Sequence, residues 1–319
     1  MTGTGRIKIV IIVGPTASGK SRLAIELARV FDGEVVSADS MQVYKGMDIG
    51  TARPSPAERG AVPHHLMDIV DPDCDYTAAR FREDAAAAIN DIDSRGKRAF
   101  VVGGTGLYIR ALTEGLFEGP GEDHRFRDGL KKEAAEHGGQ SLHRKLAEVD
   151  PVSASRTHPN NTHRVVRALE VYHLTGRPIS ELQAEHGFGE EPFDLLKIGL
   201  VKEREALYRD IDGRVDGMME AGLLAEVCRL IDAGYGAGYK EGLKSMQGLG
   251  YKEMLDHVAG GCTLEEAVRL LKRNTRHYAK RQMTWFKKDK DIRWFTSGES
   301  SVIIPVVREY FAVEVAASG

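Results

Sequence analysis

The chain has 319 residues, of which 42% are hydrophobic and 29% charged, and its formal net charge is −3. This length allows one large α/β domain and a smaller appended unit, and the weakly acidic balance excludes a protein that binds nucleic acid over its whole surface. The longest apolar stretch is shorter than the roughly 20 residues needed to cross a bilayer, and no secretory signal precedes the first predicted strand. The three cysteines (Cys74, Cys228 and Cys262) lack metal-ligand spacing, so we expect reduced thiols in a cytoplasmic protein.

The first predicted element is an apolar strand over residues 9–13, which runs into the pattern G-x-x-x-x-G-K-S and then a helix over residues 22–30. This pattern is typical of a loop whose backbone N–H groups surround a phosphate. Lys20 offers a charge to the outer phosphate oxygens, and the Ser21 hydroxyl is placed to ligate Mg²⁺. The predicted phosphate-binding residues are Gly14, Pro15, Thr16, Ala17, Ser18, Gly19, Lys20 and Ser21.

Further strands are predicted over residues 33–38 and 98–102, with a helix over residues 76–93 between them. Alternating strands and helices indicate a parallel sheet, whose carboxyl ends share one edge. The phosphate loop, Asp39 and residues 103–105 should therefore meet there. Asp39 could bind Mg²⁺ through water or accept a substrate proton, and the simpler alternative is that it caps the next turn. The adjacent His64 and His65 favour a hydrogen-bonded loop over a shared metal ion.

Strand signals stop between residues 115 and 192, where amphipathic helices are predicted over residues 124–149 and 161–175. We expect a helical insertion domain at residues 116–192 and a core domain formed by residues 1–115 and 193–319. Downstream, the sequence predicts a strand at 195–200, mainly helix at 203–230, loops at 234–250, a long helix at 263–288 capped by Thr263, a strand at 291–295 and a final helix. The fold class is α/β: a P-loop NTPase-like parallel sheet flanked by helices.

The long helix is strongly basic, with nine Lys/Arg and one Asp between residues 269 and 290. Arg273, Arg276 and Lys280 form one stripe at helical spacing, and aromatic residues lie between the cations. Such stripes suit an RNA backbone and unstacked bases, although a solvated helix face is the usual alternative. Residues 163–167 form a weaker basic cluster, and Arg209, Arg214 and Lys240 could gather around an anion. At this point an ATP-using small-molecule kinase and an RNA-binding ATPase also remain open.

Taken together, the motifs resemble those of the bacterial tRNA dimethylallyltransferase family. The resemblance rests on residues 14–21, 39–44, 48–52, 63–66, 103–105, 108, 164–170, 248–253, 273–276 and 280–286. The C-terminal zinc finger of eukaryotic relatives has no counterpart among the Cys and His residues here. The resemblance implies transfer of a dimethylallyl group from its diphosphate to N6 of the adenosine beside the anticodon (position 37), in tRNAs that read codons beginning with U. Mg²⁺ is the implied cofactor, dimethylallyl diphosphate and tRNA are the implied partners, and we expect a monomer.

The same resemblance assigns roles to individual residues. Asp39 would be the general base, Thr16 would touch the diphosphate near the bond that breaks, and Arg214 would lie near the diphosphate, with Arg209 as its close neighbour in sequence. The adenine would have to flip out of the anticodon loop to reach a buried site. The implied tRNA-binding residues are Asp39, Ser40, Met41, Gln42, Thr105, Arg127, His163, Arg164, Val165, Val166 and Arg167.

Overall fold

The computed structural model describes residues 5–117, 119–236 and 242–313. It separates into two compact units, one formed by Met1–Thr113 with Pro192–Gly319 and the other by Glu114–Glu191. The limits that the sequence suggested lie within two residues of these.

The larger unit is built on a six-stranded sheet in the order β3-β2-β4-β1-β5-β6, in which every pairing is parallel. Since β1 lies inside the sheet and both its faces are covered, its residues 9–13 are all apolar and buried. Because all pairings are parallel, the carboxyl ends of the strands lie at one edge of the sheet. The strands are β1 (Ile7–Val13), β2 (Gly33–Ser37), β3 (His64–His65), β4 (Arg98–Gly103), β5 (Phe193–Val201) and β6 (Arg293–Thr296).

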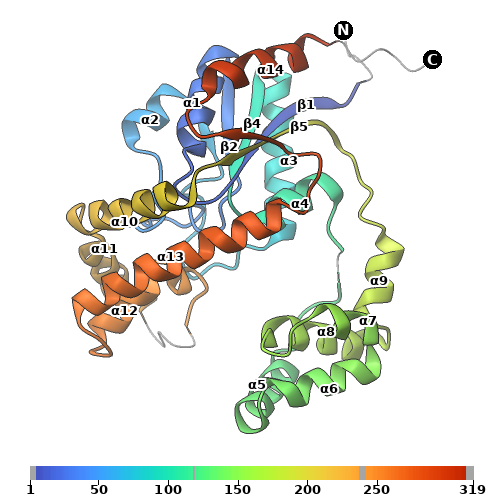
Figure 1. The fold of residues 1–319 in the computed structure, drawn as a ribbon. Helices are drawn as coiled ribbons and strands as arrows, with labels where there is room; N and C mark the ends of the chain where they lie inside the picture. Colours follow the sequence, from blue (N-terminus) through green and yellow to red (C-terminus); the bar gives the residue numbers. More distant parts are fainter. Residues whose placement is uncertain (1–4, 118, 237–241, 314–319) are drawn as a thin grey trace. The chain divides into compact units, whose positions relative to one another are not determined.

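Helices cover both faces of this sheet (Figure 1). One face packs against α1 (Lys20–Val30) and α14 (Ser300–Ala312) through a core that includes Ile12, Leu27 and Ile303. The other packs through Ile11, Phe81 and other buried residues against α3 (Ala78–Ser94), α4 (Gly106–Glu114), α12 (Tyr251–Val258) and α13 (Leu264–Phe286). The remaining helices of this unit are α2 (Pro56–Ala61), α10 (Arg204–Glu220), α11 (Leu223–Leu230), η1 (Ile231–Tyr235) and η2 (Ser245–Gln247).

Among its described residues, the smaller unit contains helices and no strand. Its core joins buried side chains such as Leu130, Leu142 and Val165. At its centre the buried carboxylate of Glu170 accepts hydrogen bonds from Arg127 and Arg167, at 2.8 and 2.6 Å. The helices are α5 (His124–His137), α6 (Gly139–Val149), α7 (Pro151–Arg156), α8 (Thr162–Thr175) and α9 (Ile179–His186).

Several predicted elements differ from the structure in detail. The helix expected over residues 124–149 is broken at Gly138, and that over 203–230 at Gly222, both glycines having positive φ (77° and 96°). The loop expected at His64 and His65 is wrong, because both residues pair with β2 as a short edge strand. Five helices, α2, α4, α7, α9 and α12, were not predicted.

The long basic helix begins as predicted, because the Thr263 hydroxyl caps it by accepting the Glu266 N–H at 3.2 Å. Within the described residues, no helix is long and apolar enough to cross a membrane.

Candidate active site

The phosphate loop leaves β1 in a conformation that few side chains tolerate. A Cβ at Gly14 would lie 2.6 Å from the Leu200 carbonyl oxygen, so only glycine fits against β5 there. Ala17 and Gly19 both have positive φ, at 64° and 86°. The loop curves back on itself so that Lys20 Nζ lies 2.7 Å from the carbonyl oxygen of Pro15, to which it donates.

Asp39 follows β2 at the same edge of the sheet. Its Oδ1 accepts the N–H of Met41 at 2.8 Å and that of Gln42 at 3.4 Å, so it does cap the next turn, the simpler of the two expectations. Burial nevertheless raises the pKa of Asp39, against the opposing effects of these N–H groups, Lys20 and Arg214. Capping therefore does not exclude proton transfer, since a raised pKa makes the carboxylate a better proton acceptor.

The end of β4 is tied to the Asp39 turn. Thr105 Oγ1 accepts the Ser40 N–H at 3.1 Å. Burial, followed by the charge of Asp39, raises the pKa of the Tyr278 hydroxyl on α13. A protonated phenol thus lies near the Asp39 carboxylate at neutral pH. In the sequence, Tyr278 stood out only as an aromatic residue of the basic helix.

Gln282 of α13 is a site residue that was not predicted from the sequence. Its Oε1 accepts the Thr16 N–H at 2.8 Å, and its Nε2 donates to the Gly104 carbonyl at 3.0 Å. A Cβ at Gly104 would lie 2.0 Å from that Nε2, so glycine is required at this contact. The spacing could have indicated that Gln282 is buried, because it follows Ala279 by three positions and precedes Phe286 by four, on the buried face of the helix.

Two cations flank the phosphate loop. Arg214 of α10 donates through Nη1 to Thr16 Oγ1 at 3.4 Å. Burial, followed by the charge of Arg214, lowers the pKa of Lys20 to about 7. Arg209 and Arg214 both line a cavity of about 610 Å³ beside Gly19, but of the two it is Arg214 that touches the loop. Lys240 lies outside the described residues.

The surroundings of Ser21 fit a magnesium ion held jointly with a diphosphate. The residue is exposed in the first turn of α1, immediately after Lys20. Among the described residues no three His, Cys, Asp or Glu side chains gather in a way that could hold a metal. Mg²⁺ is commonly bound by one or two protein groups plus substrate phosphates, so this arrangement suits a metal that arrives with the diphosphate.

The three stripe residues of α13 are not equivalent. Arg273 and Lys280 are exposed. Arg276 instead forms an ion pair with Asp212 of α10 at 2.8 Å, which holds the two helices together. Within the described chain, Arg273 and Lys280 are therefore the stripe residues best placed to meet a polyanion.

The predicted RNA-binding residues of the insertion fall into two groups. His163 and Arg164 are exposed at the start of α8, whereas the side chains of Val165 and Val166 are buried in the core of the unit. A contact between RNA and those two valine side chains is thus excluded in this conformation. Arg127 and Arg167 are bound to Glu170 inside the same unit.

Gln42, expected at the RNA surface, is also buried. Its Oε1 accepts from the Ser37 hydroxyl at 3.0 Å and its Nε2 donates to the Thr51 carbonyl at 3.2 Å. Its neighbour Met41 is partly buried and packs against Gly248, where a Cβ would lie 2.3 Å from the methionine methyl group. Gln42 and Met41 shape the Asp39 turn from inside the protein.

The lowered pKa of Lys20 predicts that binding of a diphosphate anion takes up a proton. Near pH 8 the free protein holds Lys20 largely neutral, and a bound anion restores the ammonium. Affinity for inorganic pyrophosphate should therefore fall as the pH rises above 7, by up to about tenfold per pH unit. Calorimetric titration at pH 8, in two buffers of different ionisation enthalpy, measures the proton uptake. Lys20→Gln is the control for protons taken up by pyrophosphate itself, and equal uptake in both proteins would contradict the prediction.

Comparisons with known proteins agree on one family. The IPP transferase family matches residues 42–289, and the isopentenyl transferase family matches residues 7–65. The tRNA dimethylallyltransferase 2 of Geotalea uraniireducens is 58% identical over 97% of this chain and 99% of its own length. The tRNA dimethylallyltransferase of Geobacter metallireducens is 57% identical over 91% of this chain and 92% of its own length.

Solved structures show the same relationship. The tRNA isopentenylpyrophosphate transferase of Bacillus halodurans superposes with a TM-score of 0.70 at 42% identity, covering 95% of this chain and 96% of that one. A eukaryotic dimethylallyltransferase acting on tRNA superposes with a TM-score of 0.79 at 32% identity, covering 96% of this chain and 80% of that one. The chain therefore belongs to the IPP transferase family, whose P-loop NTPase-like fold and prenyl-group transfer activity it shares.

Proposed function

We propose that this enzyme transfers a dimethylallyl group from dimethylallyl diphosphate to N6 of the adenosine at tRNA position 37, in tRNAs that read codons beginning with U. The observation that carries the proposal is the meeting of Asp39, Lys20 and Thr16 at one edge of the sheet, with the basic helix α13 tied to the same edge by Gln282. The names of the relatives support tRNA as the acceptor.

In the proposed reaction, the bond between C1 of the donor and the diphosphate oxygen breaks while a bond from adenine N6 to C1 forms. The electron pair of the broken bond leaves on the diphosphate, whose growing charge is met by loop N–H groups, Lys20 and Arg214. The N6 amine is a weak nucleophile because its lone pair is delocalised into the ring. Asp39 accepts the proton that N6 loses, and Thr105 helps to hold the Asp39 turn by accepting the Ser40 N–H. The products are N6-dimethylallyladenosine and diphosphate.

Ser21 would hold Mg²⁺ against the diphosphate, where the ion would offset negative charge on the leaving group. The residues proposed to face RNA are the partly buried Ser40 and Thr105 and the exposed His163, Arg164, Arg273 and Lys280. Arg127 and Arg167 are proposed to act by fixing the helix that carries His163 and Arg164, since both are engaged by Glu170.

The reaction is tested with purified protein, tRNA and either labelled dimethylallyl diphosphate or labelled ATP. We expect prenyl label in the RNA and no labelled phosphoryl product from ATP. Phosphoryl transfer to a small molecule would favour the kinase alternative. ATP hydrolysis stimulated by RNA, without prenyl label in the RNA, would favour an RNA-binding ATPase.

Asp39→Asn should lower turnover by about 10²–10⁴-fold, because asparagine keeps the shape of the side chain but accepts no proton. Affinities for donor and tRNA should change little. Asp32→Asn is the matched control, since Asp32 is exposed before the other end of β2. Rapid-quench measurement of single-turnover rates distinguishes the roles: a loss confined to donor or Mg²⁺ affinity would assign Asp39 to the metal instead.

Replacing both Arg273 and Lys280 with Gln should weaken tRNA binding and flatten its salt dependence. The slope of log K against log salt should fall by about 0.7–0.9 for every phosphate that the variant no longer neutralises. Arg276 is left intact because removing it would break the ion pair with Asp212. The control pair, Arg29→Gln with Arg308→Gln, changes the net charge equally on the opposite face of the sheet. Filter binding of labelled tRNA at three ionic strengths gives the slopes, and identical slopes in both double variants would refute a role for this stripe.

A further inference from the structure

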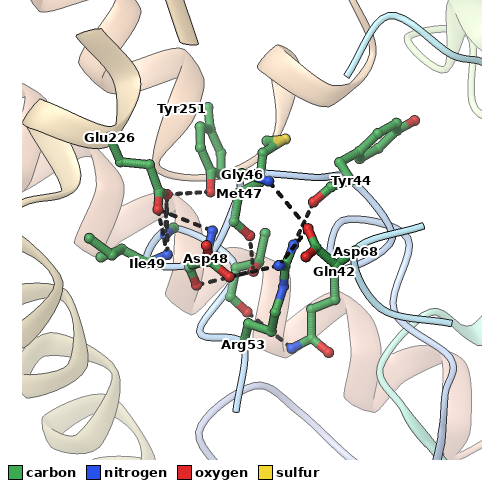
Figure 2. A network of polar contacts seen from close by, with 12 residues as sticks. Gln42, Tyr44, Gly46, Met47, Asp48, Ile49, Arg53, Asp68, Glu226 and Tyr251 are labelled. Carbon is green, nitrogen blue, oxygen red and sulfur yellow. Dashed lines mark hydrogen bonds and ion pairs between the residues drawn. The ribbon is translucent and has the colours of Figure 1, made fainter. Parts of the chain in front are cut away.

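The loop over residues 47–53 has no part in the scheme above, yet a carboxylate from a distant part of the chain holds it firmly. Glu226 of α11 is 1% exposed. Its Oε2 accepts the N–H groups of Asp48 and Ile49 at 3.1 and 2.9 Å, and its Oε1 accepts that of Gly50 at 3.1 Å. Figure 2 shows this carboxylate beside the loop backbone. Charge-assisted hydrogen bonds to three successive residues fix the path of the loop.

Tyr251 of α12 supports the same carboxylate from inside the core. Its side chain is fully buried, and its hydroxyl donates to Glu226 Oε1 at 2.7 Å. Its ring also lies against the loop, because a Cβ at Gly50 would come within 2.5 Å of it. The loop is therefore packed as well as hydrogen-bonded, and the Tyr251 hydroxyl is a donor to Glu226 that does not belong to the loop.

Gln42 connects this loop to the Asp39 turn. Its Nε2 donates to the Thr51 carbonyl at 3.2 Å, and its backbone N–H reaches Asp39 Oδ1 at 3.4 Å. The Thr51 hydroxyl donates to the Met47 carbonyl at 2.7 Å, which closes the loop on itself. A displacement of the loop is therefore passed to the Asp39 carboxylate through a single residue.

Arg53 provides a second connection between the loop and the same turn. Its side chain is 1% exposed, and its guanidinium donates to the Tyr44 carbonyl (Figure 2). It also forms ion pairs with Asp48 at 2.7 Å and Asp68 at 2.9 Å. The Asp68 N–H in turn donates to the Gln42 carbonyl at 3.0 Å. The end of the turn is therefore attached to the loop at two points.

We propose that Glu226 is a positioning residue for Asp39, the proton acceptor, which it holds in place through the loop over residues 47–53. The inference rests on the proposed function, in which Asp39 receives the proton of the N6 amine. Proton transfer requires the two groups to lie within hydrogen-bond reach, and a misplacement of about 1 Å can lower the rate about 100-fold. Glu226 thus serves the reaction without touching the substrate.

The pH dependence of the reaction separates positioning from other roles of Glu226. The N–H groups of Met41 and Gln42 lower the pKa of Asp39 against the effect of burial. If the loop loosens, the Gln42 N–H moves away, the pKa of Asp39 rises, and the carboxylate stays protonated up to a higher pH. Loss of the negative charge of Glu226 acts in the opposite direction, because a negative charge nearby raises the pKa of a carboxyl group.

The other titratable or charged groups that face Asp39 lie on four helices and are not changed by a substitution at Glu226. They are Lys20 of α1, Tyr108 of α4, Arg214 of α10 and Tyr278 of α13. A shift of the rate profile to higher pH is therefore expected from positioning and not from the change of charge.

The test uses Glu226→Gln, which keeps the shape of the side chain but turns an amide nitrogen toward at least one backbone N–H. Single-turnover prenyl transfer is measured at saturating donor and tRNA between about pH 5 and pH 9. The rate at the plateau should fall by about 10- to 100-fold, with little change in the affinities for donor and tRNA. The acid limb of the profile should move to higher pH.

The matched control is Tyr251→Phe, which removes a donor to Glu226 but leaves the three loop amides in place. It should lower Tm while keeping the plateau rate and the acid limb of the wild type. Gly50→Ala is a second variant, because its methyl group would push the loop away from Tyr251 without a change of charge. It should move the acid limb in the same direction as Glu226→Gln.

An acid limb that is unchanged or moves to lower pH in Glu226→Gln would overturn the positioning role and leave prenyl transfer intact. A wild-type acid limb in Gly50→Ala would overturn it as well, and so would a Tyr251→Phe protein with the same loss of rate as Glu226→Gln. Wild-type protein that puts no prenyl label into tRNA would overturn the proposed function itself.

Discussion

The structure depends on the two hydrogen bonds of one buried side chain, Gln282. Its amide joins the Thr16 N–H of the phosphate loop to the Gly104 carbonyl after β4, at 2.8 and 3.0 Å. Because the same residue belongs to α13, the helix that carries the exposed cations cannot move without moving the loop. Because a displacement of reacting groups by about 1 Å can lower a reaction rate by a large factor, this coupling bears on the rate of the reaction. The absence of a side chain at Gly104 is what allows the approach.

Near Gln282, the pKa values of two site residues are shifted in opposite directions. Burial raises the pKa of Asp39 and lowers that of Lys20, so both are biased toward their neutral forms in the free protein. A diphosphate brings the negative charge that stabilises the ammonium, whereas the loss of a proton from an amine requires the carboxylate to gain one. The two groups therefore suit different parts of a displacement reaction. Lys20 suits the stabilisation of the departing anion, and Asp39 suits the acceptance of the proton.

Local patterns predicted the parts of this site that are local in the chain. An apolar run followed by the phosphate-loop pattern specifies strand, loop and helix, and parallel strands bring Asp39 and Thr105 to the loop. Partners distant in sequence were not predictable in this way. Thr16 and Gln282 are 266 positions apart, and the arginines of the insertion read as free cations until Glu170 is placed beside them. Gln42 likewise looked like a surface group, and only the tertiary packing shows both ends of its amide in use.

The contact of Glu226 with three successive backbone amides has a wider consequence. Amides that converge in this way form a nest, the same kind of anion receptor that a phosphate loop uses. The described residues of the larger unit thus include a nest of this kind besides the one proposed at the phosphate loop, and the protein's own carboxylate fills it. Because the Glu226 carboxylate occupies these amides, they are not available to bind a phosphate group. The loop after β1 is the place where we propose that a diphosphate binds.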